Sequence, residues 1–255
     1  MSTLTSLDAR ARYVLALGDD ALIMSHRLGE WITHAPQLEE DVALANLGLD
    51  LLGQARSLLT YAGELEGAGR DEDALAYLRD ERDFLNLQVV EVPNGDFAVT
   101  IARLFVFSAY QYELYARLVD SRDETLAAIA AKAIKEVTYH RDHATQWVLR
   151  LGDGTAESHQ RMQAGLDRIW PYVAEIFVAD PTVADAVGDG VAVDVAVLRE
   201  PWERYVTPMI EEGTLTVPEP AFRAAGGRQG IHTEAMGYLL AEMQHLHQAH
   251  PGATW

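Results

Sequence analysis

Hydrophobic residues recur at helical spacing along most of the chain, and short clusters rich in Gly, Pro and Asp separate the periodic stretches. The breaks are "HAPQ", "EGAGRD", "VPNGD", "SRDE", "LGDGT" and "HPG". This pattern predicts helices at about residues 8–33, 38–67, 72–88, 96–120, 123–151, 156–177, 195–212 and 233–249. Two regions, at about 178–194 and 213–232, remain irregular.

The predicted helix 38–67 is the most informative for the architecture. Its leucines at positions 44, 47, 49, 51 and 52 point in almost every direction around the axis. A helix that is apolar nearly all round is expected to be buried among other helices. Short connections between the early helices favour antiparallel neighbours. Since alternating strand patterns are nearly absent and no linker divides the chain, we expect one all-α domain over residues 1–255. It would be a bundle of long antiparallel helices with additional C-terminal helices.

Composition narrows the classes of function. The chain has 255 residues, of which 39 are acidic and 20 basic, so the net charge is −19. Nucleic acid and anionic membranes are unfavourable partners for such a surface. The chain contains no cysteine, which excludes disulfides, thiolate metal sites and thiol catalysis. The N-terminal stretch lacks the apolar core of a signal peptide, and the most apolar region is shorter than the roughly 20 residues of a membrane span. We therefore expect a cytoplasmic protein.

The stretch "AIKEVTYHRDH", at residues 133–143, carries the first candidate for a metal site. Di-iron bundles take one Glu from each of two helices and a Glu-x-x-His from each of two others. This spacing places the carboxylate and the imidazole on one helix face. Here Glu136 is followed at that spacing by Tyr139, and His140 comes one position late. The ligand pair is therefore incomplete.

The other helices that would supply ligands show similar gaps. Helix 38–67 offers only Asp50 in its interior, and helix 72–88 offers Glu81 with Phe84 at the histidine position. The inward face of helix 96–120 has no carboxylate, and phenylalanine cannot bind iron. We expect no catalytic, cofactor-binding or metal-binding residue in this chain. The positions of the degenerate site would be Asp50, Glu81, Phe84, Glu136, Tyr139 and His140.

Glu136 and His140 have a second interpretation that needs no metal. The helical wheel places His140 on the apolar stripe and Glu136 at its edge. A buried Glu–His pair at i and i+4 can satisfy each group by hydrogen bonding, and this interpretation is favoured over a ligand. Glu242 and His245 form a true Glu-x-x-His, but a single copy lacks the second histidine and the additional carboxylates.

The segment "FRAAGGRQGIHTEAM", at residues 222–236, is a candidate for binding phosphate. Loop glycines allow close approach of the backbone, while arginines and a helix N-terminus favour anions. The residues that could contact the phosphates of CoA, or an acidic partner, are Arg223, Gly227, Arg228 and Thr233. The alternative is an ordinary connection with two solvated arginines, since no Walker-type spacing is present.

Longer strings are more specific than these motifs, and together they extend over nearly the whole chain. They are "LALGDDALIMSHRLGEWITHAPQLEEDVALANLGLDLLGQAR", "RDERDFLNL", "EVPNGDFAVTIAR", "AKAIKEVTYH", "GIHTEAMGYLLAEMQHL" and the closing "PGATW". On these strings the sequence closely resembles the family of C subunits of bacterial ring-1,2-phenylacetyl-CoA epoxidases, the phenylacetate-CoA oxygenase complexes.

This resemblance implies a ferritin-like fold and a place in a multicomponent monooxygenase of phenylacetate degradation. In that family a related A subunit holds the di-iron centre and epoxidises the aromatic ring of phenylacetyl-CoA. Electrons come from NADPH through a separate reductase with FAD and an iron–sulfur cluster. The C subunit of the family is structural, lacks the metal and pairs with the catalytic subunit.

The resemblance also sets the expected partners. They are the catalytic di-iron A subunit, a second copy of the chain when it is alone, and phenylacetyl-CoA by indirect contact. Two alternatives stay open. One is an independent ferritin-like di-metal oxidoreductase that uses Glu81, Glu136 and His140, with His143 as a further ligand. The other is a metal-free carrier that binds acyl-CoA.

Overall fold

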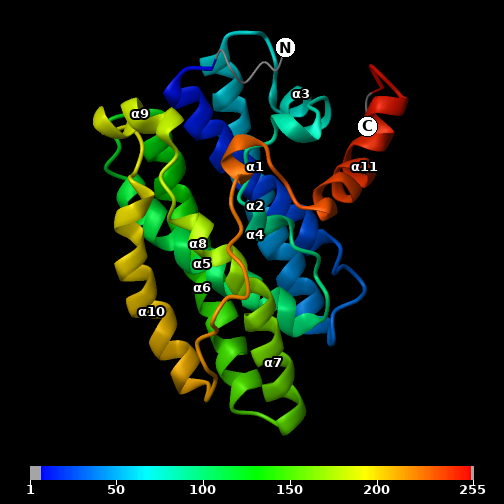
Figure 1. Cartoon of the computed structure of the whole chain (residues 1–255). Coiled ribbons are helices and arrows are strands. Elements are labelled where there is room, and N and C mark those ends of the chain that lie inside the picture. The colour runs from blue at the N-terminus through cyan, green and yellow to red at the C-terminus, as the bar shows by residue number, and fades with distance from the viewer. Residues whose placement is uncertain (1–6, 254–255) are drawn as a thin grey trace. The chain divides into compact units, whose positions relative to one another are not determined.

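A computed structural model describes residues 7–253 of the chain (Figure 1). The first six and last two residues lie outside it, including the end of the closing "PGATW" string. The described residues form helices joined by turns and extended segments, and they contain no β-strand, so the predicted all-α class is confirmed. None of these helices is both long and apolar enough to cross a membrane.

The described chain divides into two compact units. Unit 1 contains residues up to 92 together with 180–188 and the residues from 226 onward. Unit 2 contains residues 93–179 and 189–225. The expectation of a single domain over 1–255 stays a prediction.

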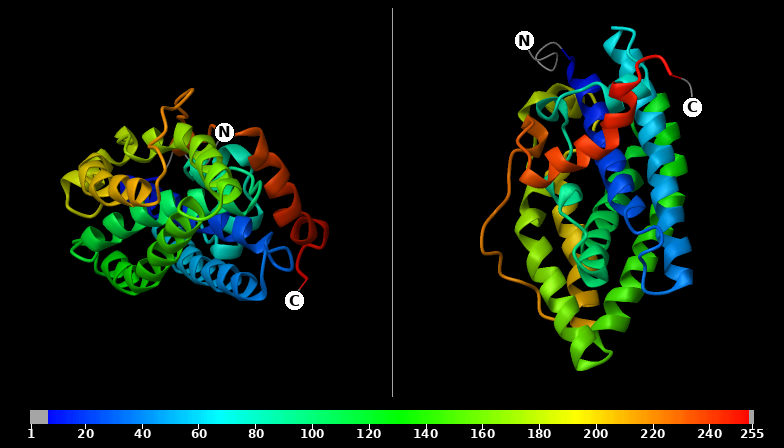
Figure 2. Two further views of the ribbon diagram at one scale, coloured as in Figure 1. Left: turned by 90° about the horizontal axis from the view of Figure 1, so that it is seen from below. Right: turned by 90° about the vertical axis from the view of Figure 1, so that its right-hand side faces the viewer.

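Unit 1 is built on the helix pair α1 (Ala9–Gly29) and α2 (Leu38–Glu66), close to the ranges predicted. The Asp8 side chain caps α1 by accepting the Ala11 N–H, and Gly67 ends α2 in the left-handed region. Figures 1 and 2 show the two helices side by side. They are antiparallel, because the Ser25 hydroxyl near the end of α1 donates to the Gly48 carbonyl at 2.7 Å, while Gly18, earlier in α1, lies against Leu59, later in α2.

The predicted helix 72–88 is wrong. The structure has a short α3 (Glu72–Tyr77), a 3-10 turn η2 (Glu81–Asp83), an extended stretch and the single turn α4 (Gln88–Glu91). The physical reason lies on α1, whose buried carboxylates accept backbone N–H groups of this segment. Those amides are therefore unavailable for an i to i−4 helical ladder.

The remaining elements of unit 1 are short except for the last helix. They are η4 (Pro181–Val183), α9 (Ala184–Gly188), η6 (Gly227–Gln229) and α11 (Glu234–Ala249). The first two fall in a region that the sequence pattern left irregular, and they contact α1. Helix α11 matches its predicted range and contacts α3 and α4.

Unit 2 is built on α5 (Phe97–Leu118) and α6 (Glu124–Gly152), which also match their predicted ranges. Asp96 and Asp123 cap them by accepting the N–H groups of Val99 and Leu126. Helix α5 is buried on nearly all sides, with α6 and α7 packed against it. The short connection and the contact between Phe97 and Trp147, whose ring centroids lie 4.9 Å apart, make the pair antiparallel.

The later helices of unit 2 are less regular than the sequence predicts. The predicted helix 156–177 divides into α7 (Ala156–Ile169), a 3-10 turn η3 (Trp170–Tyr172) that contains Pro171, and α8 (Val173–Ile176). The predicted helix 195–212 begins as the 3-10 turn η5 (Val195–Leu198) and continues as α10 (Arg199–Glu212). Trp202 anchors α10 by donating its indole N–H to the Val106 carbonyl at 3.1 Å.

Gly165 allows α7 to approach α5 closely, because a Cβ at this position would lie 2.8 Å from the Ala98 carbonyl oxygen. We expect Gly165→Ala to lower the free energy of unfolding by about 1–3 kcal/mol through overpacking. Gly29→Ala is the matched control, since a Cβ there meets nothing within 4 Å, and it should stay within about 1 kcal/mol of wild type. Urea denaturation of both variants tests this, and equal stabilities would contradict the packing argument.

Candidate functional site

The predicted metal positions of unit 1 do not form a ligand pair. Asp50 is half-buried on α2. Glu81 is exposed in the turn η2, and Phe84 follows as a fully buried residue of the extended stretch. The expectation that Glu81 and Phe84 share one helix face is wrong, because no helix runs through them. The Phe84 ring instead makes a cation–π contact with the guanidinium of Arg79, whose central carbon lies 4.1 Å from the ring centroid.

The predicted positions of unit 2 lie on α6 and face different environments. His140 is fully buried, whereas Tyr139, at the position where a metal-binding histidine would stand, is 54% exposed. Glu136 lies near Lys132, with 3.6 Å between the amine and carboxylate atoms. A hydrogen-bonded pair of Glu136 with His140 stays a prediction. Over the whole described range of the chain, no group of three or more His, Asp or Glu side chains is arranged to hold a metal ion. The residues present therefore do not fit a di-iron centre.

A cluster of buried charges lies elsewhere, at the middle of α1. Asp19 and Asp20 are adjacent in sequence and both are buried. The Arg79 guanidinium donates to both carboxylate oxygens of Asp19, and the side chains of this pair are 1% and 0% exposed. The Leu85 N–H donates to the same carboxylate at 2.8 Å. A buried charge of this kind is tolerated only when paired and hydrogen-bonded, and Asp19 meets both conditions.

Asp20 is paired in the same way with a residue more than 200 positions away. Arg228 donates through Nη1 to Oδ1 at 3.0 Å and through Nη2 to Oδ2 at 2.7 Å, which is a bidentate geometry. The Leu87 N–H donates to Asp20 Oδ1 at 2.8 Å. Burial raises the pKa of Asp20, and the charge and hydrogen bonds of Arg228 together with the Leu87 amide oppose that rise.

Arg228 also holds two backbone carbonyls, those of Leu85 at 2.8 Å and Ala16 at 3.1 Å. Both terminal nitrogens of this arginine are thus engaged within unit 1. A phosphate contact by this side chain would first have to break the ion pair with Asp20. Gly230, two residues later, has φ +70°, a conformation that favours glycine. A Cβ at this position would lie 2.3 Å from the Arg82 carbonyl oxygen, so only glycine allows this approach of the backbone.

The other residues of the predicted phosphate loop have separate environments. Gly227 is buried in the turn η6. Thr233 stands at the N-cap position of α11, but its hydroxyl and its N–H both donate to Glu91 Oε2 at 3.0 Å instead of capping the helix. Arg223, in unit 2, is exposed and lines a pocket of about 200 Å³ with Arg199 and Trp170. Contact of this loop with CoA stays a prediction.

A second buried cluster surrounds Glu91 at the end of α4. The Arg27 guanidinium donates to the Glu91 carbonyl at 2.8 Å, and the Glu91 carboxylate accepts from Thr233 and from His232 Nδ1 at 3.2 Å. His232 Nε2 lies 3.0 Å from the Phe84 carbonyl oxygen. Since both neighbours of the ring are acceptors, a doubly protonated imidazole can donate to Glu91 from Nδ1 and to Phe84 from Nε2.

The pKa of His232 follows from competing causes. Burial lowers it, while the hydrogen bond and charge of Glu91 and the Phe84 carbonyl raise it, and the net direction is upward from 6.5. The His232 and Glu91 side chains are both fully buried, so the charged pair is screened little by solvent. This pairing stabilises the protonated histidine.

We call these groups together the α1 network: Asp19, Asp20, Arg27, Arg79, Glu91, Arg228, His232 and Thr233. The network holds segments of unit 1 together, because each buried carboxylate is paired with a cation or with N–H donors. Of its members the sequence indicates only Arg228 and Thr233, and those as candidates for binding phosphate. Its signal was the pair "DD" inside the apolar run "LALGDDALIM", since two acids in a buried helix require partners.

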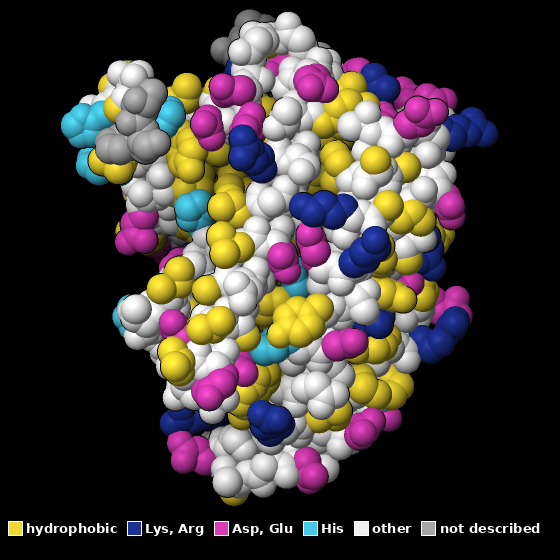
Figure 3. Space-filling model, turned by 180° about the vertical axis from the view of Figure 1, so that it is seen from behind, with side chains coloured by type: hydrophobic (Ala, Val, Ile, Leu, Met, Phe, Trp, Pro, Cys, Tyr) yellow, Lys and Arg dark blue, Asp and Glu magenta, His cyan; other side chains and the backbone are white. Residues whose placement is uncertain are grey.

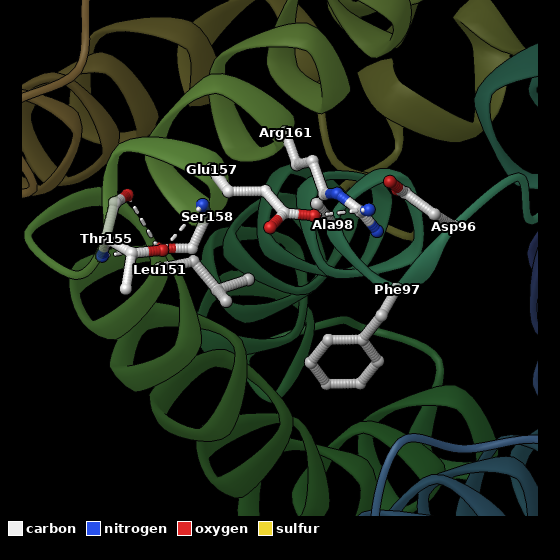
Figure 4. Close-up of a pocket in the computed structure, with 8 residues that line it drawn as sticks. All are labelled: Asp96, Phe97, Ala98, Leu151, Thr155, Glu157, Ser158 and Arg161. Atoms are coloured by element: carbon white, nitrogen blue, oxygen red, sulfur yellow. Dashed lines mark hydrogen bonds and ion pairs between the residues drawn. The ribbon is translucent and has the colours of Figure 1, made fainter.

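Unit 2 contains a pocket of about 210 Å³ between the start of α5 and the turn from α6 to α7 (Figure 4). The polar side chains that line it are engaged with one another or with helix ends. Thr155 and Ser158 form a capping box, and Glu157 pairs with Arg161 at 2.6 Å. The lining groups are thus used to cap helices and to pair at the surface, and they do not converge on a common reacting point.

Comparisons with known proteins agree with the resemblance carried by the long strings. The model of the phenylacetic acid catabolic protein family matches residues 2–255. The C subunit of the 1,2-phenylacetyl-CoA epoxidase of Escherichia coli (strain K12) is 52% identical over 243 residues, which cover 95% of this chain and 98% of that protein. The predicted resemblance and the predicted all-α, ferritin-like fold are confirmed.

Removing one member of the α1 network should leave a buried charge without its partner. We expect Arg228→Met to lower the free energy of unfolding by about 3–5 kcal/mol. Arg204→Met is the matched control, because the Arg204–Glu200 pair on α10 is exposed and should contribute at most about 1 kcal/mol. Urea denaturation near neutral pH compares them. A cost for Arg228→Met no larger than that of the control would contradict a structural role for this ion pair.

The raised pKa of His232 predicts how its contribution changes with pH. A group whose pKa is higher in the folded state contributes its full stabilisation below the unfolded value, about pH 6.5, and loses it as pH rises through the folded value. The stability difference between wild type and His232→Gln should therefore be larger at about pH 6 than at about pH 9. Thermal unfolding across this range measures it, with the exposed His245→Gln as control. A difference that grows toward high pH would reverse the assigned sign.

Proposed function

The chain belongs to the phenylacetic acid catabolic protein family, and from this premise we propose that it is the structural subunit of a multicomponent phenylacetyl-CoA 1,2-epoxidase. In this role it pairs with a separate catalytic subunit that carries the di-iron centre. A reductase with FAD and an iron–sulfur cluster delivers the electrons of NADPH to that catalytic subunit. This chain itself holds no metal and performs no redox step.

The main support for the proposal is that the positions where a di-iron site would have its ligands lack a converging set of donors. An iron pair requires several carboxylates and imidazoles that converge on one point. Here Glu81 is exposed in a 3-10 turn, Phe84 replaces a donor with an apolar ring, and Tyr139 is turned to the surface. The donor chemistry that the family's catalytic reaction needs is thus missing from these positions, which supports a structural role for the chain.

The buried acids of unit 1 also support a structural role for the chain. Asp19, Asp20 and Glu91 are the kind of residue that could bind iron, but arginine or histidine already neutralises each of them. A carboxylate fixed in such a pair is a poor ligand, because binding a cation would require breaking the pair. These groups instead hold extended segments against α1, which suits a subunit whose task is to keep a rigid shape beside its partner.

The similarity to the C subunit of the Escherichia coli epoxidase supports the choice of reaction and partner. That protein is named as one subunit of an enzyme that acts on phenylacetyl-CoA, and identity of 52% over nearly the full length of both chains favours the same assembly here. The substrate, on this proposal, is processed at the partner's iron, and this chain contributes indirectly by bracing the partner's helices.

Iron analysis of separately purified subunits and of their complex tests the proposal. We expect iron to follow the catalytic subunit, with far less than one iron per molecule of this chain alone. NADPH oxidation that depends on phenylacetyl-CoA should require the catalytic subunit and the reductase. Two tightly bound irons on this chain, with turnover in the absence of the catalytic subunit, would show that it is an independent oxidoreductase.

Two variants sharpen that measurement. Glu81→Gln and Glu136→Gln remove the carboxylates that an iron site on this chain would need, and both positions are at least partly exposed. The iron content and turnover of the complex should stay unchanged in each. A loss of iron in proportion to turnover in either variant would assign a ligand to this chain and contradict the proposal.

A further inference from the structure

The outer face of α2 carries a row of hydrophobic side chains that the described residues leave uncovered. Leu38, Val42, Leu49 and Leu52 are between 43% and 74% exposed. With the half-buried Ala45 between them they occupy positions 38, 42, 45, 49 and 52, so that steps of four and three residues alternate. We call this row the α2 stripe. Figure 3, which views the molecule from behind, shows several separate groups of exposed hydrophobic side chains.

An alternation of four and three is the spacing of a and d positions in helices that pack against another helix. From residue 38 to residue 52 the stripe extends about 21 Å, which is four turns of helix. The opposite face of α2, with Leu44, Leu47 and Leu51, is already buried in unit 1. Helix α2 thus has two apolar faces. The sequence predicts a helix buried all round, whereas the described residues cover only one side of it.

Charge indicates what kind of surface covers the other side. Glu39 and Asp41 stand beside the α2 stripe at the e and g positions, where charged side chains select the partner of a helix. The sequence contains no Lys or Arg between Arg27 and Arg56. Arg56, at the end of the stripe, pairs with Glu72, with 3.1 Å between the paired atoms. The stripe is therefore flanked by acids at its start, although Asp41 also accepts the Thr33 N–H, and the later e and g positions are uncharged.

A second copy of this chain is a poor occupant. It would place one acidic stripe against another, and each copy carries a net charge of −19. A helix with its own apolar a and d positions, flanked by lysine and arginine, would match both the shape and the charge. The geometry and charge of the stripe favour a different polypeptide over self-association through this face.

Resting on the proposed function, we infer that the α2 stripe is the surface on which the catalytic iron-carrying subunit docks, through an apolar helix face of that subunit bordered by basic side chains. A helix face about 21 Å long and 10 Å wide covers roughly 200 Å², against about 800 Å² per partner in a stable interface. The stripe is therefore the apolar centre of the contact, and neighbouring polar surface forms its rim.

Binding of full-length variants to the separately purified catalytic subunit tests this inference. Leu49→Lys places a charge at the centre of the stripe and should raise the Kd by at least about tenfold. Glu39→Lys removes one of the flanking acids and should weaken binding and reduce its salt dependence. Leu246→Lys is the matched control, since Leu246 is similarly exposed on α11, and it should bind like wild type.

The results distinguish a failure of the docking surface from a failure of the proposed function. If the wild-type chain binds the catalytic subunit and both α2 variants bind it with the same Kd, the docking surface is wrong and the proposed function stands. If the wild-type chain does not bind the catalytic subunit, the proposed function is wrong. Sedimentation of the chain alone gives a further check: if Leu49→Lys abolishes a homodimer but leaves binding of the catalytic subunit unchanged, the stripe belongs to a second copy and the inference is wrong. If Leu49→Lys lowers the melting temperature of the chain, its weaker binding could come from misfolding. The Kd of Glu39→Lys then decides whether the stripe is the docking surface.

Discussion

Two adjacent carboxylates in the middle of a buried helix are the constraint on which unit 1 depends. Asp19 and Asp20 lie on α1 among apolar residues, and in a low-dielectric interior neither can stay charged without a partner. Arg79 and Arg228 provide that compensation from segments far away in the sequence. The extended stretch after α3 and the loop before α11 are consequently fixed to α1 by ion pairs and by amide hydrogen bonds.

This constraint also explains the loss of regular structure where a metal-binding helix would be needed. The amides of Leu85 and Leu87 donate to the two aspartates, so the chain cannot continue as a helix through Phe84. The buried acids serve to hold the fold together, while Glu81 and Phe84 lie outside any α-helix and Tyr139 is exposed. The supporting role proposed above rests on this structural use of the carboxylates. The proposed docking of a partner rests separately on the exposed α2 stripe.

The regular part of the fold could be predicted from the sequence. Helices α1, α2, α5, α6 and α11 follow from apolar periodicity and from capping residues such as Asp96, because these signals are local. The segment 72–88 could not, since its competing interactions come from residues on another helix. The turn at Trp170–Tyr172 could have been found, because Pro171 marks it.

The candidate site was predictable only in part. Residue type alone shows that Phe84 cannot bind a metal, but the assignment of these positions to a degenerate site stays a prediction. The role of Arg228 could not be recognised, because a loop arginine near glycines predicts phosphate binding equally well until its partner Asp20 is known. Likewise, the leucines around α2 predict burial but not whether the same chain provides it. In each case the missing information is a contact distant in sequence.

Hydrogen exchange of single amides tests the central role of the aspartates most directly. The N–H groups of Leu85 and Leu87 lie outside any helix but donate to the buried carboxylates of Asp19 and Asp20 at 2.8 Å. If the aspartates hold this segment, both amides exchange as slowly as amides in the middle of α1. The Leu87 amide then becomes fast in Asp20→Ala and the Leu85 amide in Asp19→Ala, without loss of protection in unit 2. Exchange of these two amides at the rate of exposed loop residues in the wild-type protein would contradict this role of the aspartates.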